Sequence, residues 1–175
     1  MLDVYKIRKD FPILGKKVNN TDLIYFDNAA TSQTPNQVIN VISNYYREIN
    51  SNIHRGLHSL SADATNKYEN SRSIIKNHFG ASHEHEIIFT SGTTHGINII
   101  SSGLEKFISS KDELIVSEME HHSNIVPWQM LCEKTGSKLK VIPINDDGTL
   151  DIDEYKSLLT PKVKFVFINH VSNTL

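Results

Sequence analysis

The stretch Phe89-Thr90-Ser91-Gly92-Thr93-Thr94-His95-Gly96-Ile97-Asn98 has the pattern of a strand, a tight turn and the start of a helix. An apolar run, Ile87 to Phe89, leads into small and hydroxylated residues, and a helical pattern follows them. Gly92 permits backbone angles that other residues avoid. Hydroxyl side chains flank the amide groups that a helix start leaves without partners. We therefore expect the fold to be organised around this turn.

The same turn has the features of a phosphate site. Free N–H groups, the positive end of a helix dipole and the hydroxyls of Ser91, Thr93 and Thr94 together suit a phosphate group. The phosphate-loop patterns GxxxxGK[ST] and GxGxxG are both absent from the sequence. An ordinary capped turn is therefore the alternative interpretation.

A second stretch, Ser117 to Trp128, follows another short apolar run, Leu114 to Val116, and contains His121 and His122. Parallel strands of one sheet deliver the residues that follow them to the same edge. We therefore expect the turn and a histidine to meet at one edge of the sheet.

Five motifs, taken with their order and spacing, resemble the cysteine desulfurases of the SufS type. These are pyridoxal-phosphate enzymes with the aspartate aminotransferase fold, and the resemblance covers nearly the whole chain. The motifs are D-N-A-A at Asp27 to Ala30, H-R-G-L-H at His54 to His58, S-G-T-T-H-G-I-N at Ser91 to Asn98, M-E-H-H-S-N-I-V-P-W-Q at Met119 to Gln129, and H-V-S-N at His170 to Asn173.

The resemblance implies an α/β fold, namely the large domain of a PLP-dependent transferase (aspartate aminotransferase-like, fold type I), incomplete at its C-terminus. We expect residues 1–20 to form an N-terminal helical segment and residues 21–175 to form the N-terminal part of the domain that binds pyridoxal 5'-phosphate. The sequence stops shortly after the apolar run Phe165 to Ile168, which suggests a protein about twice as long. A complete small domain is the alternative.

The resemblance also implies roles for particular residues. Thr93 and Thr94 would hold the cofactor phosphate, and His121 would stack on the cofactor ring and act as the catalytic acid–base group. Asn173 would contact the ring oxygen and the substrate. His122 is the weaker histidine candidate, because adjacent residues of an extended backbone point to opposite sides.

Four further substrate-binding candidates lie in the first third of the chain. Ala29 and Ala30 are small, so a substrate can approach the backbone closely there. A plain turn is the alternative for this motif. His54 and Arg55 lie in a loop that, by resemblance, borders the active site near a dimer interface. The spacing of His54 and His58 also suggests zinc, but Gly56 between them argues against the helix that such a site needs, so we predict no metal.

Short apolar runs typical of strands alternate with helical patterns along the chain, which predicts a largely parallel sheet with right-handed crossovers. We expect strands at Leu23 to Phe26, Glu86 to Thr90, Leu114 to Ser117, Lys138 to Ile144 and Val163 to Ile168. We expect helices near Val4 to Ile13, from Ser61 to Phe79 and from Thr94 to Phe107. Three further helices are expected to follow N-terminal caps: one after a capping box at Thr34 to Gln37, one after Ser123, and one from Ile152 to Leu159 after a capping box that starts at Asp151.

Composition excludes several classes of partner. A net charge of −2 gives no field that attracts nucleic acid or an acidic membrane surface. The N-terminus lacks a signal-peptide core, and the chain has one cysteine, which fits a reducing cytoplasmic compartment. That residue, Cys132, lies on the apolar face of a predicted helix, so we expect a buried structural thiol.

Three functions remain open at this stage. The first is the N-terminal part of a cysteine desulfurase that converts L-cysteine, or L-selenocysteine, to L-alanine and passes sulfur as a persulfide to an acceptor protein for iron–sulfur cluster assembly. By resemblance the complete protein would be a homodimer. The cofactor-binding lysine and the persulfide cysteine would follow H-V-S-N, so residues 1–175 would be inactive alone. The alternatives are a catalytically inactive module of that family and a nucleotide-phosphate binding α/β protein.

Overall fold

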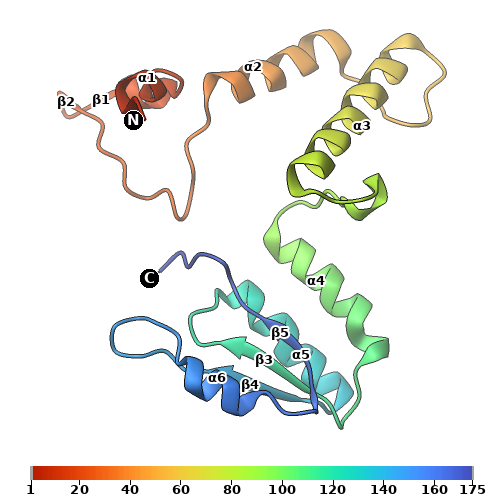
Figure 1. The fold of residues 1–175 in the computed structure, drawn as a ribbon. Coiled ribbons are helices and arrows are strands. Elements are labelled where there is room, and N and C mark those ends of the chain that lie inside the picture. The colour runs from red at the N-terminus through yellow and green to blue at the C-terminus, as the bar shows by residue number, and fades with distance from the viewer. Residues whose placement is uncertain (1, 175) are drawn as a thin grey trace. The chain divides into compact units, whose positions relative to one another are not determined.

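The computed structural model describes residues 2–174, and the chain divides after Ile88 into two units. The first unit is mostly helical, whereas the second is an α/β unit with a parallel sheet (Figure 1). The predicted helical segment, residues 1–20, lies within the first unit. The predicted domain boundary at residue 21 stays a prediction.

The first unit consists of one long helix and several short helical elements. Its elements are α1 (Val4–Arg8), η1 (Pro12–Gly15), β1 (Lys17–Val18), β2 (Thr21–Asp22), α2 (Asn36–Asn44), the π-helical turn η2 (Tyr45–Ile49), α3 (Ser59–Phe79) and η3 (Glu84–Glu86). Strands β1 and β2 pair as a small antiparallel hairpin.

The long helix α3 confirms the predicted element and its C-terminal stop. It ends at Gly80, whose φ of 67° places it in the left-handed region. This is the backbone geometry of a glycine helix stop. At its start the His58 ring accepts a hydrogen bond from the Ser61 N–H at 3.3 Å. Helix α3 carries Ser61 and Ala64, the two buried residues among those described in the first unit.

Several predictions for the first unit are wrong in detail. Leu23 to Phe26 is not a strand, because it has no pairing partner among residues 2–174 and Phe26 is 93% exposed. The first helix spans only Val4–Arg8 and has no buried residue. Helix α2 begins at Asn36, with Pro35 at the cap position and no side-chain cap, because Thr34 lies one residue too early to cap the first turn.

The second unit contains the sheet and the helices that cover it. Its elements are α4 (Thr93–Leu104), η4 (Glu105–Phe107), β3 (Glu113–Ser117), η5 (His122–Asn124), α5 (Val126–Thr135), β4 (Lys138–Ile142), α6 (Ile152–Leu158) and β5 (Val163–Phe167). The predicted strand at Glu86 to Thr90 is absent, since this run has no ladder partner among the described residues. The Asp151 side chain caps α6 as predicted, by accepting from the Glu154 N–H at 2.8 Å.

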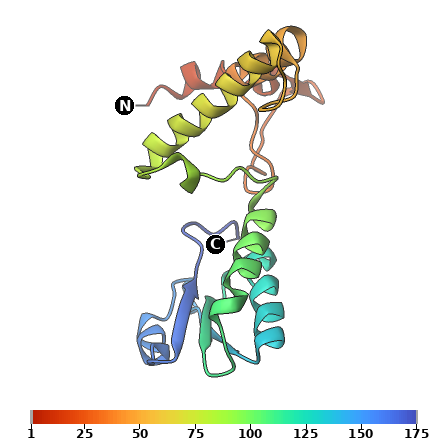
Figure 2. The ribbon, with the colours of Figure 1, turned by 90° about the vertical axis from the view of Figure 1, so that its right-hand side faces the viewer.

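Strand β3 is the centre of a parallel sheet with the order β4-β3-β5. From β3 the chain passes through α5 to β4 at one edge of the sheet. From β4 it passes through α6 to β5 at the other edge, in the opposite direction across the sheet. Right-handed crossovers therefore place α5 and α6 on opposite faces, as Figure 2 shows. All five residues of β3 are buried, which explains why its middle is a continuous apolar run rather than an alternating one.

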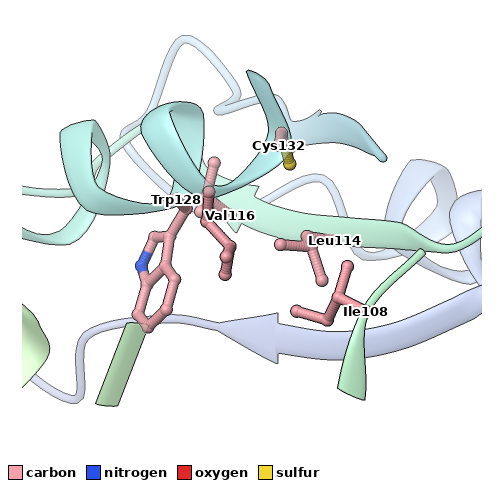
Figure 3. Packing of buried hydrophobic residues seen from close by; sticks show 6 residues of the cluster. Ile108, Leu114, Val116, Trp128 and Cys132 are labelled. Atoms are coloured by element: carbon pink, nitrogen blue, oxygen red, sulfur yellow. The ribbon is translucent and has the colours of Figure 1, made fainter. Parts of the chain in front are cut away.

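The core lies between the sheet and helices α4 and α5 (Figure 3). Trp128 from α5 is 1% exposed, and its ring stacks on Phe167 of β5 with centroids 3.6 Å apart and planes 5° apart. Leu114 and Val116 alternate with Ile115 along β3 and face this core. Cys132 belongs to the same cluster, which confirms the predicted buried thiol.

An ion pair between buried Glu113 and half-buried Lys140 joins the start of β3 to β4. The Glu113 carboxylate contacts the Lys140 ammonium of β4 at 2.8 Å and accepts a hydrogen bond from the Thr160 hydroxyl at 3.0 Å. The Lys140 contact, joined by the Thr160 bond, lowers the pKa of Glu113 despite the opposing effect of burial.

We predict that Glu113→Gln lowers the melting temperature near neutral pH. The folded-state pKa of Glu113 is lowered, so its stabilisation is present above the ordinary value of about 4.5 and is lost as the pH falls through the folded-state pKa. The gap between wild type and variant should therefore close in acid. Melts followed by circular dichroism across the acid range test this, with exposed Glu133→Gln as the control. A gap that stays constant in acid would contradict the assignment.

We also predict that Cys132 reacts with thiol reagents only when the second unit opens. Burial raises the pKa of its thiol, an effect that the Ser137 hydrogen bond partly offsets, so little thiolate is exposed. An aromatic disulfide reagent should modify the single thiol slowly in buffer and at once in denaturant. Immediate stoichiometric reaction in buffer would show that the thiol is accessible.

Candidate functional site

The turn at the start of α4 depends on the backbone conformation of Gly92. Its φ of 143° is rarely adopted by residues with a side chain, and no atom lies within 4 Å of the position that a Cβ would take. The Gly92 carbonyl accepts the first helical hydrogen bond, from Gly96 N–H at 3.1 Å. The space beside this backbone is therefore open to a ligand.

Thr93 and Thr94 occupy the first turn of α4 and are both exposed. Their hydroxyls make no hydrogen bond to any of the residues 2–174. The first N–H groups of a helix also have no partner within the helix. Hydroxyls and amides are thus available together at the positive end of a helix dipole, which is a favourable position for an anion.

His95 is a part of this turn that sequence reasoning did not interpret. Its Nδ1 accepts a hydrogen bond from the Ser91 N–H at 3.3 Å and lies 3.0 Å from the Ser91 hydroxyl. The Ser91 groups are therefore engaged by His95 instead of being free for a ligand. The i, i+4 spacing of the two residues is the sequence signal for this contact.

His121 caps the short helix η5. Its Nδ1 accepts from the Ser123 N–H at 3.1 Å and lies 2.8 Å from the Ser123 hydroxyl. An Nδ1 that accepts a backbone N–H leaves the proton of the neutral ring on Nε2, so Nε2 is a free donor. The prediction that Ser123 caps the following helix is wrong, because η5 intervenes and α5 begins only at Val126, with no side-chain cap.

The second unit contains both the anion turn, Gly92 to Thr94 at the start of α4, and His121. Helix α4 packs against η5. His121 follows β3 and Asn173 follows the adjacent strand β5, which pairs with β3 up to Val116 and Phe167. The segments after these strands therefore leave the sheet at the same edge. His122 is also exposed there, and its ring lies edge-on to His121 with centroids 6.2 Å apart.

Ala29 and Ala30 lie in an exposed turn of the first unit. The Thr31 N–H donates to the Asp27 carbonyl at 3.0 Å, and the Tyr25 hydroxyl donates to the Thr31 carbonyl at 2.6 Å. The structure thus shows the plain turn that was the alternative interpretation. A role of these alanines in substrate binding stays a prediction.

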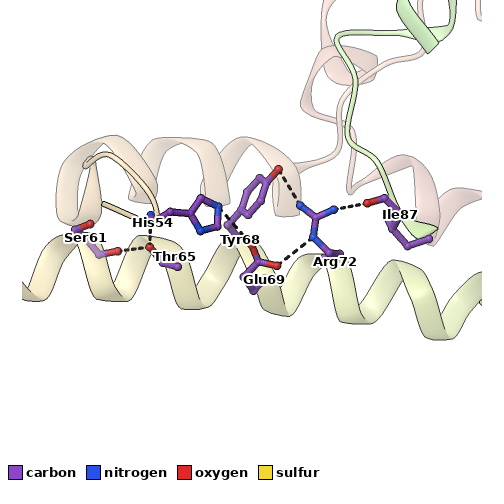
Figure 4. Close-up of polar contacts among 7 residues, drawn as sticks. All are labelled: His54, Ser61, Thr65, Tyr68, Glu69, Arg72 and Ile87. Carbon is purple, nitrogen blue, oxygen red and sulfur yellow. Dashed lines mark hydrogen bonds and ion pairs between the residues drawn. The ribbon is translucent and has the colours of Figure 1, made fainter. Parts of the chain in front are cut away.

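The loop that carries His54 and Arg55 is fastened to α3 (Figure 4). His54 has a φ of 70°, which is uncommon outside glycine. Its N–H donates to the Thr65 hydroxyl at 2.9 Å, and its Nε2 lies 3.4 Å from the Glu69 carboxylate. Gly56 lies directly on Ser61, where an added Cβ would overlap the serine side chain.

Arg72 completes this network. Its Nε contacts the Glu69 carboxylate at 3.1 Å, and its guanidinium also donates to the Tyr68 hydroxyl and to the Ile87 carbonyl. This group was not predicted from the sequence, although Thr65, Tyr68, Glu69 and Arg72 have the spacing of one helix face. His54 is thus paired within its own unit, whereas the exposed Arg55 guanidinium makes no ion pair with any of the described residues.

The structure contains no group of histidine, cysteine or acidic residues suited to a metal within residues 2–174. Among the same residues, none of the helices combines the length and the apolar character that a membrane span requires.

The fold and the anion turn define an aminotransferase-like unit, and comparison with known proteins identifies the family. The family model described as Aminotransferase class-V matches residues 24–175, and the chain belongs to this family. The predicted aspartate aminotransferase-like α/β fold is thereby confirmed.

Individual relatives share a more specific description. A probable cysteine desulfurase of Staphylococcus epidermidis is 51% identical over 174 residues, which are 99% of this chain and 42% of that protein. The apo structure of a cysteine desulfurase from Thermococcus onnurineus NA1 is 39% identical with a TM-score of 0.87, over 99% of this chain and 41% of that one. The cysteine desulfurase CsdA of Escherichia coli is 30% identical with a TM-score of 0.82, over 99% and 42% of the two chains. The chain thus spans less than half the length of these relatives.

Proposed function

We propose that this chain is the N-terminal part of a PLP-dependent cysteine desulfurase, which converts L-cysteine to L-alanine and transfers the sulfur as an enzyme persulfide. The observation that carries this proposal is the open anion turn at the start of α4, a helix that also packs against η5, the element that His121 caps. The identity of 51% to a probable cysteine desulfurase supports the sulfur chemistry in particular.

The residues present fit the phosphate of pyridoxal 5'-phosphate. The turn offers two exposed hydroxyls, from Thr93 and Thr94, and the N–H groups of the first helical turn. Open space at Gly92 lets a phosphate approach the backbone. When bound, this cofactor supplies an electron sink for the substrate carbon. The work of Thr93 and Thr94 is to hold and orient the phosphate.

His121 is the proposed catalytic residue. Ser123 occupies Nδ1, so Nε2 is the ring nitrogen left to hold or release a proton. An imidazole suits this task because its ordinary pKa lies near neutrality. A flat ring held from one side by Ser123 can also stack on a cofactor ring and fix its plane.

Substrate contacts form a second group of proposals. Arg55 is exposed and unpaired among the described residues, which suits it to a substrate carboxylate. The pairing of His54 with Glu69 suggests that His54 supports the loop as well as contacting a ligand. Ala29 and Ala30 would line the substrate edge, and exposed Asn173 would contact the substrate and the cofactor ring oxygen.

The complete protein is proposed to be a cytoplasmic homodimer that delivers sulfur to an acceptor protein for iron–sulfur cluster assembly. Large apolar side chains on the first unit, such as Phe26 and Leu57, are almost fully exposed, which supports a protein surface that covers them. L-selenocysteine is an alternative substrate.

We predict that His121 and Thr94 separate turnover from cofactor retention in the complete protein. His121→Ala should keep most of the cofactor and lose at least about 100-fold in desulfuration rate, because acid–base groups contribute roughly 10²- to 10⁴-fold. Thr94→Ala should lose cofactor first. Cofactor content by absorbance and alanine formation from cysteine measure the two properties. Thr34→Ala, an exposed threonine whose hydroxyl has no hydrogen bond within residues 2–174, is the control.

Two results would contradict this division of roles. One is equal loss of cofactor in both variants, and the other is greater damage from His122→Ala than from His121→Ala. A complete protein that binds no pyridoxal phosphate would instead favour an inactive module or a nucleotide-phosphate binding protein.

A further inference from the structure

We propose that Glu120 is a positioning residue, which locks the His121 segment to the segment that carries His170 and Asn173. The functional meaning of these segments rests on the function proposed above. The lock itself rests on the contacts of Glu120, a buried residue that is only 8% exposed.

Both oxygens of Glu120 are occupied by donors from separate parts of the second unit. Oε1 accepts from the Ser117 hydroxyl at 2.5 Å and from the Asn169 N–H at 2.9 Å. Oε2 accepts from the Asn124 side-chain amide at 2.7 Å. The carboxylate therefore joins the end of β3, the short helix η5 and the segment after β5 at one point.

Trp128 fixes which end of the Asn124 side-chain amide faces Glu120. Its indole N–H donates to the Asn124 side-chain carbonyl at 2.9 Å, so the Asn124 NH₂ group must face Glu120. The Trp128 ring also stacks on Phe167, two residues before Asn169. A movement of the Asn169 segment would thus disturb both Glu120 and the indole.

Only an acceptor fits at position 120, because every polar group aimed at it is a donor. A buried carboxylate without a cation is expensive, and Glu120 makes no ion pair within residues 2–174. Three hydrogen bonds from three segments offset this desolvation. An apolar side chain could fill the space that the Glu120 side chain occupies. Only a hydrogen-bond acceptor at position 120 can bind donors from all three segments at once.

A swap of the polar groups tests the lock. In Glu120→Gln, the new NH₂ group meets the Asn124 amide or the Asn169 N–H in either orientation of the side chain. Asn124→Asp places two carboxylates against each other. In the double variant, the side-chain carbonyl at position 120 can accept from Ser117 and Asn169. The NH₂ group at position 120 then donates to the carboxylate at position 124, which still accepts from the Trp128 indole.

Hydrogen exchange measured by NMR in this chain reads the lock directly, because the single tryptophan gives one indole signal. Each single variant should speed exchange at the Trp128 indole and the Asn169 amide at least about tenfold, and the double variant should return both to within about threefold of wild type. Glu118→Gln, two residues away and exposed, is the matched control and should change neither signal. Unchanged exchange in the single variants, or a double variant no better than the worse single, would overturn the proposal.

A second measurement separates positioning from mere stability. In the complete protein loaded with pyridoxal phosphate, the visible circular dichroism of the cofactor reports how its ring is held. Glu120→Gln should weaken that band per bound cofactor and lower kcat, and the double variant should restore both. A band and kcat unaffected by Glu120→Gln would overturn the positioning role. A wild-type protein without any cofactor band would count against the proposed function, while the exchange result would still decide the lock.

Discussion

Parallel pairing of β3 with strands on both sides is the constraint on which the candidate site depends. Because β4, β3 and β5 run in one direction, the segments that follow them emerge at one edge of the sheet. His121 and Asn169 reach that edge from different strands, and Glu120 can bridge them there. The helices on the two faces of the sheet bury β3 completely, so the edge rests on a rigid strand.

Local signals in the sequence were enough to predict much of the second unit. The apolar run at Leu114 to Val116 and the cap at Asp151 both correspond to observed elements, because each depends mainly on residues next to it in the chain. Leu23 to Phe26 has an equally strong strand pattern but forms no ladder, because a strand also needs a partner, which residues 2–174 do not provide. Capping predictions at Thr34 and Ser123 failed through errors in the position of the helix start.

In the candidate site, too, local sequence features could be predicted and contacts between distant residues could not. Thr93, Thr94 and His121 were identified from motifs and a family resemblance, and their proposed roles stay predictions. The groups that hold them were not identified. The proton position on His121 follows from Ser123 and could be inferred only with distances. The donors to Glu120 include Asn169, which lies far along the chain, so no local pattern indicates their convergence.

The strand order also bears on how this unit folds. The paired residues Glu113 and Lys138 are 25 positions apart (138 − 113), whereas Leu114 and Phe165 are 51 apart (165 − 114). Doubling the length of a closed loop adds about 0.6 kcal/mol of chain entropy, so joining β3 to β4 is the less demanding step. Strand β5, added next, carries the backbone amide that completes the Glu120 network. The edge that would hold the cofactor is therefore complete only once β5 has docked, in the same step that brings Phe167 onto Trp128.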